Sequence, residues 1–206
     1  MGCPLFRPLA NETDPTLSYT KKKVLLIGLD GSGKTTILHR LKSGKFQQTL
    51  PTVGLNIETA LIKNIEFLIF DVGGKVRSLW THYYENLNAL IFVIDSTDKE
   101  RMWQVREELV KLNEDLKFQN VSLLVFFNKQ DLKDRAEFND LIEWTGVKEV
   151  LEMDIIVQKC SALNGEGLNE GIEKLINFME NANFGKVRLA RPNSTFTSNS
   201  FLQKKN

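Results

Sequence analysis

A glycine-rich turn followed by a lysine and a threonine is the first place where this sequence could bind phosphate. Residues 28–35 read GLDGSGKT, which fits the pattern G-x-x-x-x-G-K-[ST]. The glycines let successive backbone N–H groups point inward around phosphate oxygens, and a helix starting here adds its positive dipole end. Lys34 would bridge the outer phosphates, and Thr35 would offer its hydroxyl to Mg²⁺. The residues expected at the phosphates are Gly28, Asp30, Gly31, Ser32, Gly33, Lys34, Thr35 and Thr36.

A second motif, Asn128-Lys129-Gln130-Asp131, could identify the base. The Asp131 carboxylate can accept two N–H bonds from the N1 and N2 edge of guanine, and adenine has no such donor pair. Asn128 would tie the loop to neighbouring segments, and the stem of Lys129 can lie on the purine face. The backbone N–H groups of Ser161, Ala162 and Leu163 could meet the guanine oxygen. Alone this motif reads as a solvated turn, but the phosphate loop upstream favours guanine.

Two further segments could sense the third phosphate. Asp71 ends an apolar run and is placed to reach Mg²⁺ through water, while the N–H of Gly74 could approach the γ-phosphate. Thr52 lies between the phosphate loop and this run, so it is the natural second hydroxyl for Mg²⁺. The expected metal ligands are therefore Thr35, Thr52 and Asp71, and loss of the γ-phosphate would release both loops.

The elements that must position these residues follow from apolar periodicity. Short apolar runs predict strands at 24–27, 55–62, 65–71, 89–95, 122–128 and 154–160. Helical patterns separate them at about 34–42, 99–116, 136–150 and 168–181. Alternating strands and helices predict an α/β fold with a six-stranded, mostly parallel sheet and helices on both faces, as in P-loop GTPases. The pair 55–62 and 65–71 forms a hairpin that supplies one antiparallel edge.

The length and composition of the chain indicate one globular domain with two extensions. We assign residues 1–20 to an N-terminal extension, 21–182 to the domain, and 183–206 to a flexible tail. The tail carries five basic residues and no acid, so the net charge of +1 leaves −4 for residues 1–182. This balance gives no reason to expect nucleic-acid binding. The two cysteines make neither a disulfide framework nor a zinc site, which indicates a reducing compartment.

The motifs together resemble the Arf and Arf-like family of small GTPases. The resemblance runs from about Lys22 to Asn181, and the stretches that carry it are Gly28-Leu29-Asp30, 51–56, 71–74, Leu79-Trp80, His82-Tyr83, 95–98, 128–132 and 160–163. It implies binding of GTP, GDP and Mg²⁺, and an exchange factor, an activating protein and effectors as partners of a monomer. It also implies cycling between cytosol and a membrane. The family's aromatic cluster beside the hairpin has its counterparts here in Leu55, Phe70 and Tyr83.

The main departure from the family lies after Gly74. The family has a glutamine here that orients the attacking water, whereas this chain has Lys75, in a segment two residues short. A lysine cannot accept a hydrogen bond from that water. Lys75 either contacts the γ-phosphate or points to solvent. In both cases we expect slow intrinsic hydrolysis and a weak response to activating proteins that work through the glutamine.

The N-terminus suggests attachment to a membrane surface. Gly2 resembles an N-myristoylation site and Cys3 a neighbouring palmitoylation site, although position six holds Phe6 instead of Ser or Thr. No apolar run approaches the length of about 18 residues that spans a bilayer. We therefore expect a cytoplasmic protein with peripheral membrane association. Two functions stay open: a switch in membrane traffic or membrane-associated signalling, and a hydrolysis-impaired scaffold that holds nucleotide almost permanently.

Overall fold

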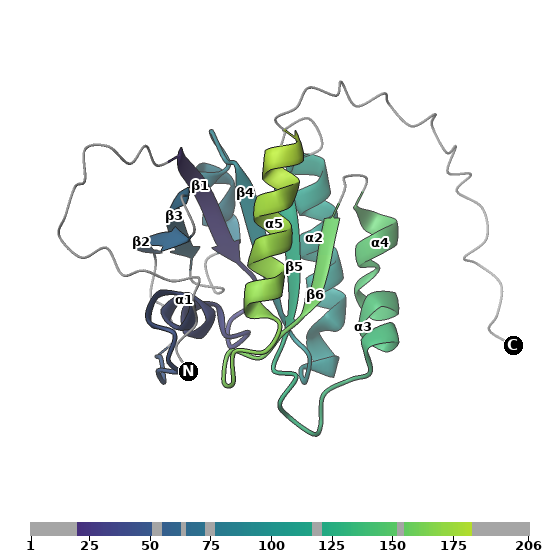
Figure 1. Ribbon diagram of the computed structural model, residues 1–206. Helices are drawn as coiled ribbons and strands as arrows, with labels where there is room; N and C mark the ends of the chain where they lie inside the picture. The colour runs from purple at the N-terminus through teal and green to yellow at the C-terminus, as the bar shows by residue number, and fades with distance from the viewer. Residues whose placement is uncertain are drawn as a thin grey trace, which may run out of the picture.

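The computed structural model describes residues 20–50, 55–62, 65–72, 77–116, 121–151 and 155–182. Its strands are β1 (Thr20–Ile27), β2 (Leu55–Ile62), β3 (Ile65–Val72), β4 (Ala89–Asp95), β5 (Ser122–Asn128) and β6 (Ile155–Lys159). They form one sheet in the order β2-β3-β1-β4-β5-β6 (Figure 1). β2 runs antiparallel to β3, and the other neighbours are parallel. The predicted fold class is confirmed.

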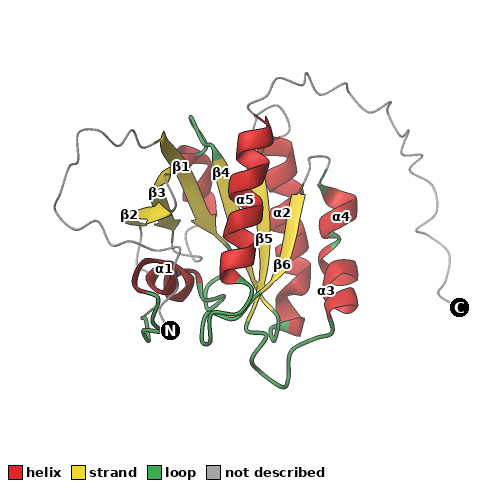
Figure 2. Cartoon of the chain, viewed as in Figure 1, coloured by secondary structure: helices red, strands yellow, loops and turns green. Residues whose placement is uncertain are grey.

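Helices cover both faces of this sheet (Figure 2). They are α1 (Lys34–Ser43), α2 (Met102–Leu116), α3 (Phe138–Thr145), α4 (Val147–Val150) and α5 (Leu168–Ala182), with 3-10 helices η1 (Arg77–Tyr83) and η2 (Lys99–Arg101). Successive side chains of β1 point to opposite faces. Leu25 and Ile27 join the core beneath α2, α3 and η1, while Val24 and Leu26 join the core beneath α1 and α5.

The structure differs from the sequence prediction at several elements, among them β1 and the segment 136–150. β1 begins at Thr20 instead of Val24, because its polar first half pairs with β3 at the end of the sheet, where Lys21 forms an ion pair with Glu66. The single helical segment predicted over 136–150 is also wrong. Gly146 adopts φ 59°, and its N–H bonds to the carbonyls of Ile142 and Glu143, so one helix ends there and α4 starts anew.

The parallel strands end at a common edge of the sheet. Asp95 at the end of β4 pairs with Asn128 at the end of β5, and Lys159 at the end of β6 pairs with Phe127. Asp71, near the end of β3, pairs with Leu26 of β1. Ligands of open parallel sheets bind outside the carboxyl ends of the strands. The fold therefore brings Asp71 and Asn128, two of the predicted site residues, to the edge where a ligand would bind.

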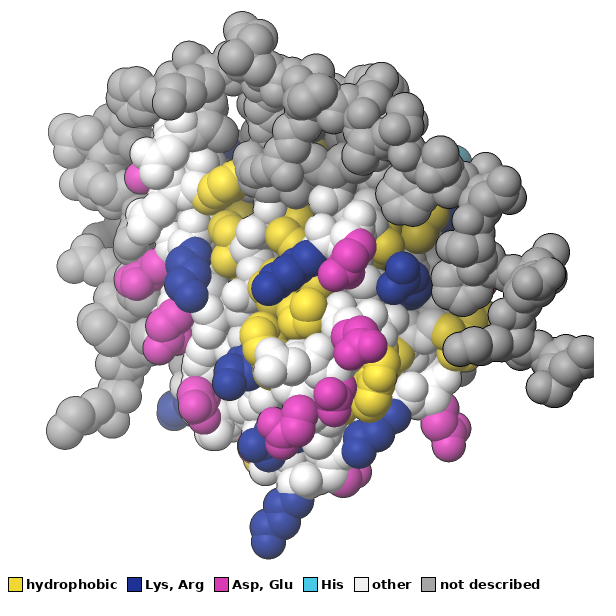
Figure 3. Space-filling view, turned by 90° about the vertical axis from the view of Figure 1, so that its right-hand side faces the viewer, with side chains coloured by type: hydrophobic (Ala, Val, Ile, Leu, Met, Phe, Trp, Pro, Cys, Tyr) yellow, Lys and Arg dark blue, Asp and Glu magenta, His cyan; other side chains and the backbone are white. Residues whose placement is uncertain are grey.

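The surface seen in Figure 3 is mixed in charge. Lys and Arg side chains alternate there with Asp and Glu, and hydrophobic side chains lie between them. Among the helices formed by the described residues, none is long and apolar enough to cross a membrane.

Candidate nucleotide-binding site

The phosphate loop connects β1 to α1 in a conformation that only glycine adopts easily. Gly28, Gly31 and Gly33 have φ values of 143°, 77° and 92°. A Cβ atom on Gly28 would lie 2.2 Å from the carbonyl oxygen of Val93, and one on Gly33 would lie 2.4 Å from Nδ2 of Asn128. At Gly31, nothing lies within 4 Å of that position. Two of these glycines are thus required by close packing as well as by backbone geometry.

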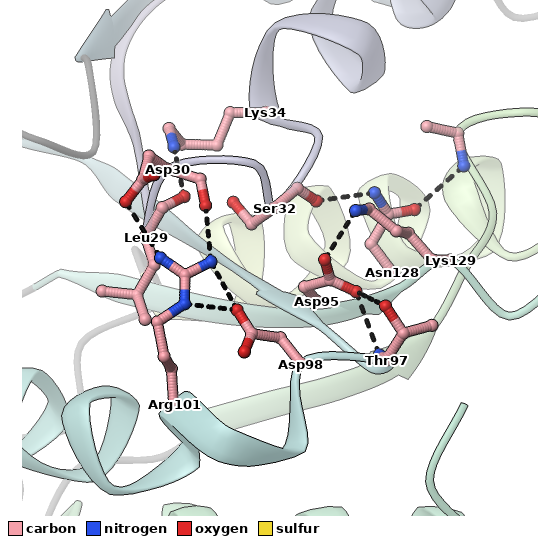
Figure 4. Close-up of polar contacts among 11 residues, drawn as sticks. Leu29, Asp30, Ser32, Lys34, Asp95, Thr97, Asp98, Arg101, Asn128 and Lys129 are labelled. Carbon is pink, nitrogen blue, oxygen red and sulfur yellow. Dashed lines mark hydrogen bonds and ion pairs between the residues drawn. The ribbon is translucent and has the colours of Figure 1, made fainter. Parts of the chain in front are cut away.

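Lys34 folds back over this loop. Its Nζ donates to the carbonyl oxygens of Gly28 at 2.9 Å and Leu29 at 2.8 Å, and the residue is buried (Figure 4). Gly33 at the N-cap of α1 provides no capping side chain, so the first turn is suited to face an anion. The hydroxyl of Ser32 is buried and has no hydrogen-bond partner among the described residues. A cationic amine, an uncapped helix start and an unsatisfied hydroxyl all fit a phosphate-binding loop.

Asn128 is the buried centre of the site. Its Nδ2 donates to the carbonyl of Ser32 at 2.8 Å, and its Oδ1 accepts the N–H of Ala162 at 2.9 Å. The thiol of Cys160 also lies 3.7 Å from Oδ1. Burial, and secondly the charge of Asp131, raise the pKa of this thiol, so it stays neutral. One side chain thereby joins the phosphate loop, the end of β5 and the segment after β6, as the sequence predicts.

The predicted base-reading residues lie together at this same edge. The Asp131 carboxylate accepts a short hydrogen bond from the hydroxyl of Ser161. Lys129 has φ 66°, unusual for a residue with a side chain, and its Nζ lies 2.5 Å from Oδ2 of Asp95. The backbone N–H of Gln130 donates to the carbonyl of Cys160 at 3.1 Å. The 128–131 and 160–163 segments therefore form one connected rim.

The remaining predicted positions lie near the start of α1 and beside the β2–β3 hairpin, or outside the described residues. Thr36 Oγ1 lies 2.9 Å from Thr49 Oγ1, which joins α1 to the chain leading toward Thr52. Phe70 and Tyr83 contact each other with ring centroids 5.6 Å apart, and Leu55 is exposed at the start of β2. Five predicted residues lie outside the described part of the chain: Gly2, Cys3, Thr52, Gly74 and Lys75.

Sequence patterns did not single out two arginines that hold the loops. Arg40 of α1 donates to the carbonyls of Leu163 at 2.7 Å and Asn164 at 2.6 Å. Arg101 donates to Oδ1 of Asp30 at 3.0 Å and to the Asp30 carbonyl at 3.1 Å. Both lie in segments that the sequence predicted as helical, at about 34–42 and 99–116, without a role for either arginine. Their partners are 71 to 124 residues away in the chain, so no local pattern reveals them.

A phosphate loop, a guanine-type base loop and a sheet of this order define a small GTPase of the P-loop class. A sequence model of the ADP-ribosylation factor (Arf) family matches residues 13–179. The chain belongs to the Arf family, and this confirms the resemblance seen in the sequence.

One solved structure similar to this chain is the Arl6 BBS3 small GTPase from Trypanosoma brucei with the bound nucleotide analogue GppNp. It is 34% identical, the match covers 79% of this chain and 99% of that one, and the TM-score is 0.73. Membership of the family makes this chain a GTP- and GDP-binding protein. It also gives the chain exchange factors, activating proteins and effectors as its general classes of partner.

Proposed function

We propose that this chain is a guanine-nucleotide switch that binds GTP or GDP with Mg²⁺ and recruits effectors in membrane traffic or membrane-associated signalling. The observation that carries this proposal is the position of Asn128, which joins the loop suited to phosphate to the loop suited to guanine. A nucleotide must contact both loops at once. A single buried side chain that sets their relative position therefore supports one composite site.

Selectivity for guanine is assigned to Asp131. Its carboxylate lies beside Ser161 at the rim, where it can accept the N1 and N2 hydrogens of guanine. An adenine base would leave this carboxylate without its donors, which is a costly loss in a site built for them. The Lys129 stem is assigned to the purine face, and the backbone of Ala162 and Leu163 to the guanine oxygen.

A competition experiment tests this assignment. The purified protein is loaded with fluorescent GDP and challenged with GTP, ATP and xanthosine triphosphate. GTP is expected to displace the probe at least about 100-fold more effectively than ATP, and Asp131→Asn should favour the xanthine nucleotide. Asp134→Asn is the matched control, because Asp134 is an exposed carboxylate three residues further on. Equal competition by ATP and GTP in the parent protein would refute the proposal.

The Mg²⁺ ligands are assigned to Thr35, Thr52 and Asp71. Hydroxyl and carboxylate oxygens are the donors this ion prefers. Thr35 lies in the first turn of α1, directly after Lys34, and Asp71 lies on β3 next to Leu26. The end of β3 and the start of α1 thus meet at one edge of the sheet, which fits a shared ion. When bound, Mg²⁺ neutralises charge on the β- and γ-phosphates.

Attachment to a membrane surface is proposed through Gly2 and Cys3. One acyl chain gives only marginal binding, so stable attachment needs two signals. Fractionation of cells that express the parent, Gly2→Ala and Cys3→Ser tests this. Each variant should shift toward the cytosolic fraction, and unchanged partition of both would disprove lipid attachment.

A second candidate function, a scaffold that holds GTP for long periods, is favoured by Lys75. Gly74 is assigned to the γ-phosphate, but the next residue supplies a charge and no acceptor for water. Single-turnover hydrolysis of the parent should be slower than that of a variant with glutamine at position 75 and two residues inserted. An arginine from an activating partner could still raise the rate about 10³–10⁵-fold. Equal rates in both proteins would favour the switch with another water-orienting group.

A further inference from the structure

We propose that Arg101 is a positioning residue for nucleotide retention, because it holds both the carboxylate and the backbone carbonyl of Asp30 in the phosphate loop. This inference rests on the proposed nucleotide site. Arg101 lies at the junction of η2 and α2, and Figure 4 shows it reaching toward Asp30 from the β4–α2 segment.

The guanidinium of Arg101 is committed on all of its nitrogens. Nη1 bonds to Oδ1 of Asp30 at 3.0 Å and Nη2 to the Asp30 carbonyl at 3.1 Å. Nε bonds to Oδ2 of Asp98 at 2.5 Å, and Nη2 forms an ion pair with the same carboxylate. Asp98 thus orients the guanidinium, and the guanidinium in turn holds both a side-chain and a main-chain atom of Asp30.

Asp30 needs such a partner because of its charge. It stands in the middle of a loop whose ligand carries several negative charges, and a carboxylate there repels the phosphates. Asp30 is 41% exposed and Arg101 is 33% exposed, so water screens this charge only in part. The ion pair neutralises the carboxylate and points it toward Arg101. The γ-phosphate adds charge, so the benefit is larger for GTP than for GDP.

The same segment also reaches the base side of the site. Lys129 bonds to Asp95, whose other oxygen accepts the N–H and the hydroxyl of Thr97 at 3.0 and 2.7 Å. Gln130 Nε2 donates to the hydroxyl of Ser96 at 2.8 Å. Residues 95–101 therefore connect the phosphate loop to the base loop by a route that does not pass through Asn128.

This arrangement requires an arginine, because three donors in one plane make the contacts with Asp98 and Asp30. A lysine at position 101 would keep the charge. Its single amine could not reach Asp98, the Asp30 carboxylate and the Asp30 carbonyl in the same geometry. The hydrogen bond to Asp98, and then the charges of Asp98 and Asp30, raise the pKa of Arg101 above its ordinary value. The guanidinium is therefore charged at every pH at which the protein is folded.

Nucleotide dissociation tests the inference. Parent protein, Arg101→Ala, Arg101→Lys and Lys99→Ala are loaded with fluorescent GDP or a fluorescent non-hydrolysable GTP analogue, and release is followed after a chase. Arg101→Ala should release GDP about tenfold faster and the GTP analogue faster still, with Arg101→Lys recovering only part of the loss. Lys99→Ala removes one exposed charge from the same turn without a bond to the phosphate loop, so its rates should match the parent.

A second substitution separates this role from general destabilisation. Adding Asp30→Asn to Arg101→Ala removes the unneutralised carboxylate, so the excess effect on the GTP analogue should disappear. If Arg101→Ala releases both nucleotides at parental rates, or if both rates rise equally and Asp30→Asn has no influence, the inference is wrong. Failure of the parent itself to hold guanine nucleotide would instead overturn the proposed function.

Discussion

Asn128 and Arg101 both connect the phosphate loop to a segment that is distant in the sequence, but they do so at different depths. Asn128 is 1% exposed and uses a neutral amide that donates to Ser32 and accepts from Ala162 and the Cys160 thiol. Arg101 is 33% exposed and uses a charged group with ionic partners. A buried polar group must be fully satisfied, whereas a charge at the rim can be partly compensated by water. We therefore expect Asn128 to decide whether the nucleotide site forms, and Arg101 to set how long the nucleotide stays bound.

The largest effect should come from Asn128→Ala. It leaves the Ser32 carbonyl and the Ala162 N–H buried without partners, which should cost about 2–4 kcal/mol of unfolding free energy and most nucleotide affinity. Thermal unfolding and the nucleotide content of the purified protein measure both. Asn128→Asp is the companion variant, since it keeps the acceptor for Ala162 but loses the donor to Ser32. A stable, nucleotide-loaded Asn128→Ala protein would show that Asn128 is not needed for the site to form.

The next largest effect is expected from a glycine substitution beside Asn128, compared with a second glycine substitution in open space. Gly33→Ala places a methyl 2.4 Å from the Asn128 amide, so it should disturb the centre and abolish tight nucleotide binding. Gly31→Ala has the same type of positive φ but open space, so it should cost only the backbone strain of about 1–2 kcal/mol. Calorimetric titration with GDP compares the two. Equal loss in both variants would mean that backbone strain, and not contact with Asn128, decides the outcome.

Arg40→Ala should have a moderate effect, because it lies at the rim on the base side. It removes two hydrogen bonds to the carbonyls of Leu163 and Asn164, which are on the protein surface. We expect release of GDP to accelerate about threefold to tenfold with little change in melting temperature. The dissociation assay described for Arg101 measures it. A large fall in melting temperature would place Arg40 with the structural centre instead.

The smallest expected effect is that of the ion pair between Lys42 of α1 and Glu58 of β2. The hydrogen bond from Lys42 lowers the pKa of Glu58 below its ordinary value of 4.5. Its contribution to stability is therefore complete above pH 4.5 and is lost as the pH falls through the lowered pKa. Glu58→Gln should destabilise by about 0.5 kcal/mol at pH 7 and by less at pH 2.5.

Glu66→Gln is the control for this pH dependence, measured by melting temperature at both pH values. Glu66 pairs with Lys21, which is 81% exposed, so no measurable change is expected. A destabilisation by Glu58→Gln that is equally large at pH 7 and pH 2.5 would show that packing, and not charge, accounts for it.

Much of the fold was predictable from sequence because its signals are local. The apolar runs of β4 and β5 are buried on both faces, so they show as continuous stretches and match the predicted bounds. The phosphate loop was predictable because its chemistry needs glycines at fixed spacing. The break at Gly146 was missed, since a glycine inside a helical pattern is often tolerated and only its positive φ reveals the end of a helix.

The contacts at the rim of the site were not predictable for a different reason. Arg40 acts on backbone carbonyls, and Arg101 acts on a backbone carbonyl and on the carboxylates of Asp30 and Asp98. The contacts that hold the loops join residues 71 to 124 positions apart, so they leave no pattern in the sequence around the arginine. Asn128 was predictable because it belongs to a recognisable motif. The sequence therefore indicated the loops that carry recognisable motifs better than the residues outside those motifs that hold the loops in place.

The contacts of Asn128 also have a consequence for the order of events during synthesis. The donor and acceptor partners of its amide come from Ser32, early in the chain, and Ala162, late in the chain. At about 5–20 residues per second, a ribosome needs roughly ten seconds to travel from one to the other. A nascent chain that has the phosphate loop but not Ala162 has an incomplete site. Nucleotide should therefore be captured only after Ala162 has been synthesised, when the loop after β6 closes over an otherwise finished sheet.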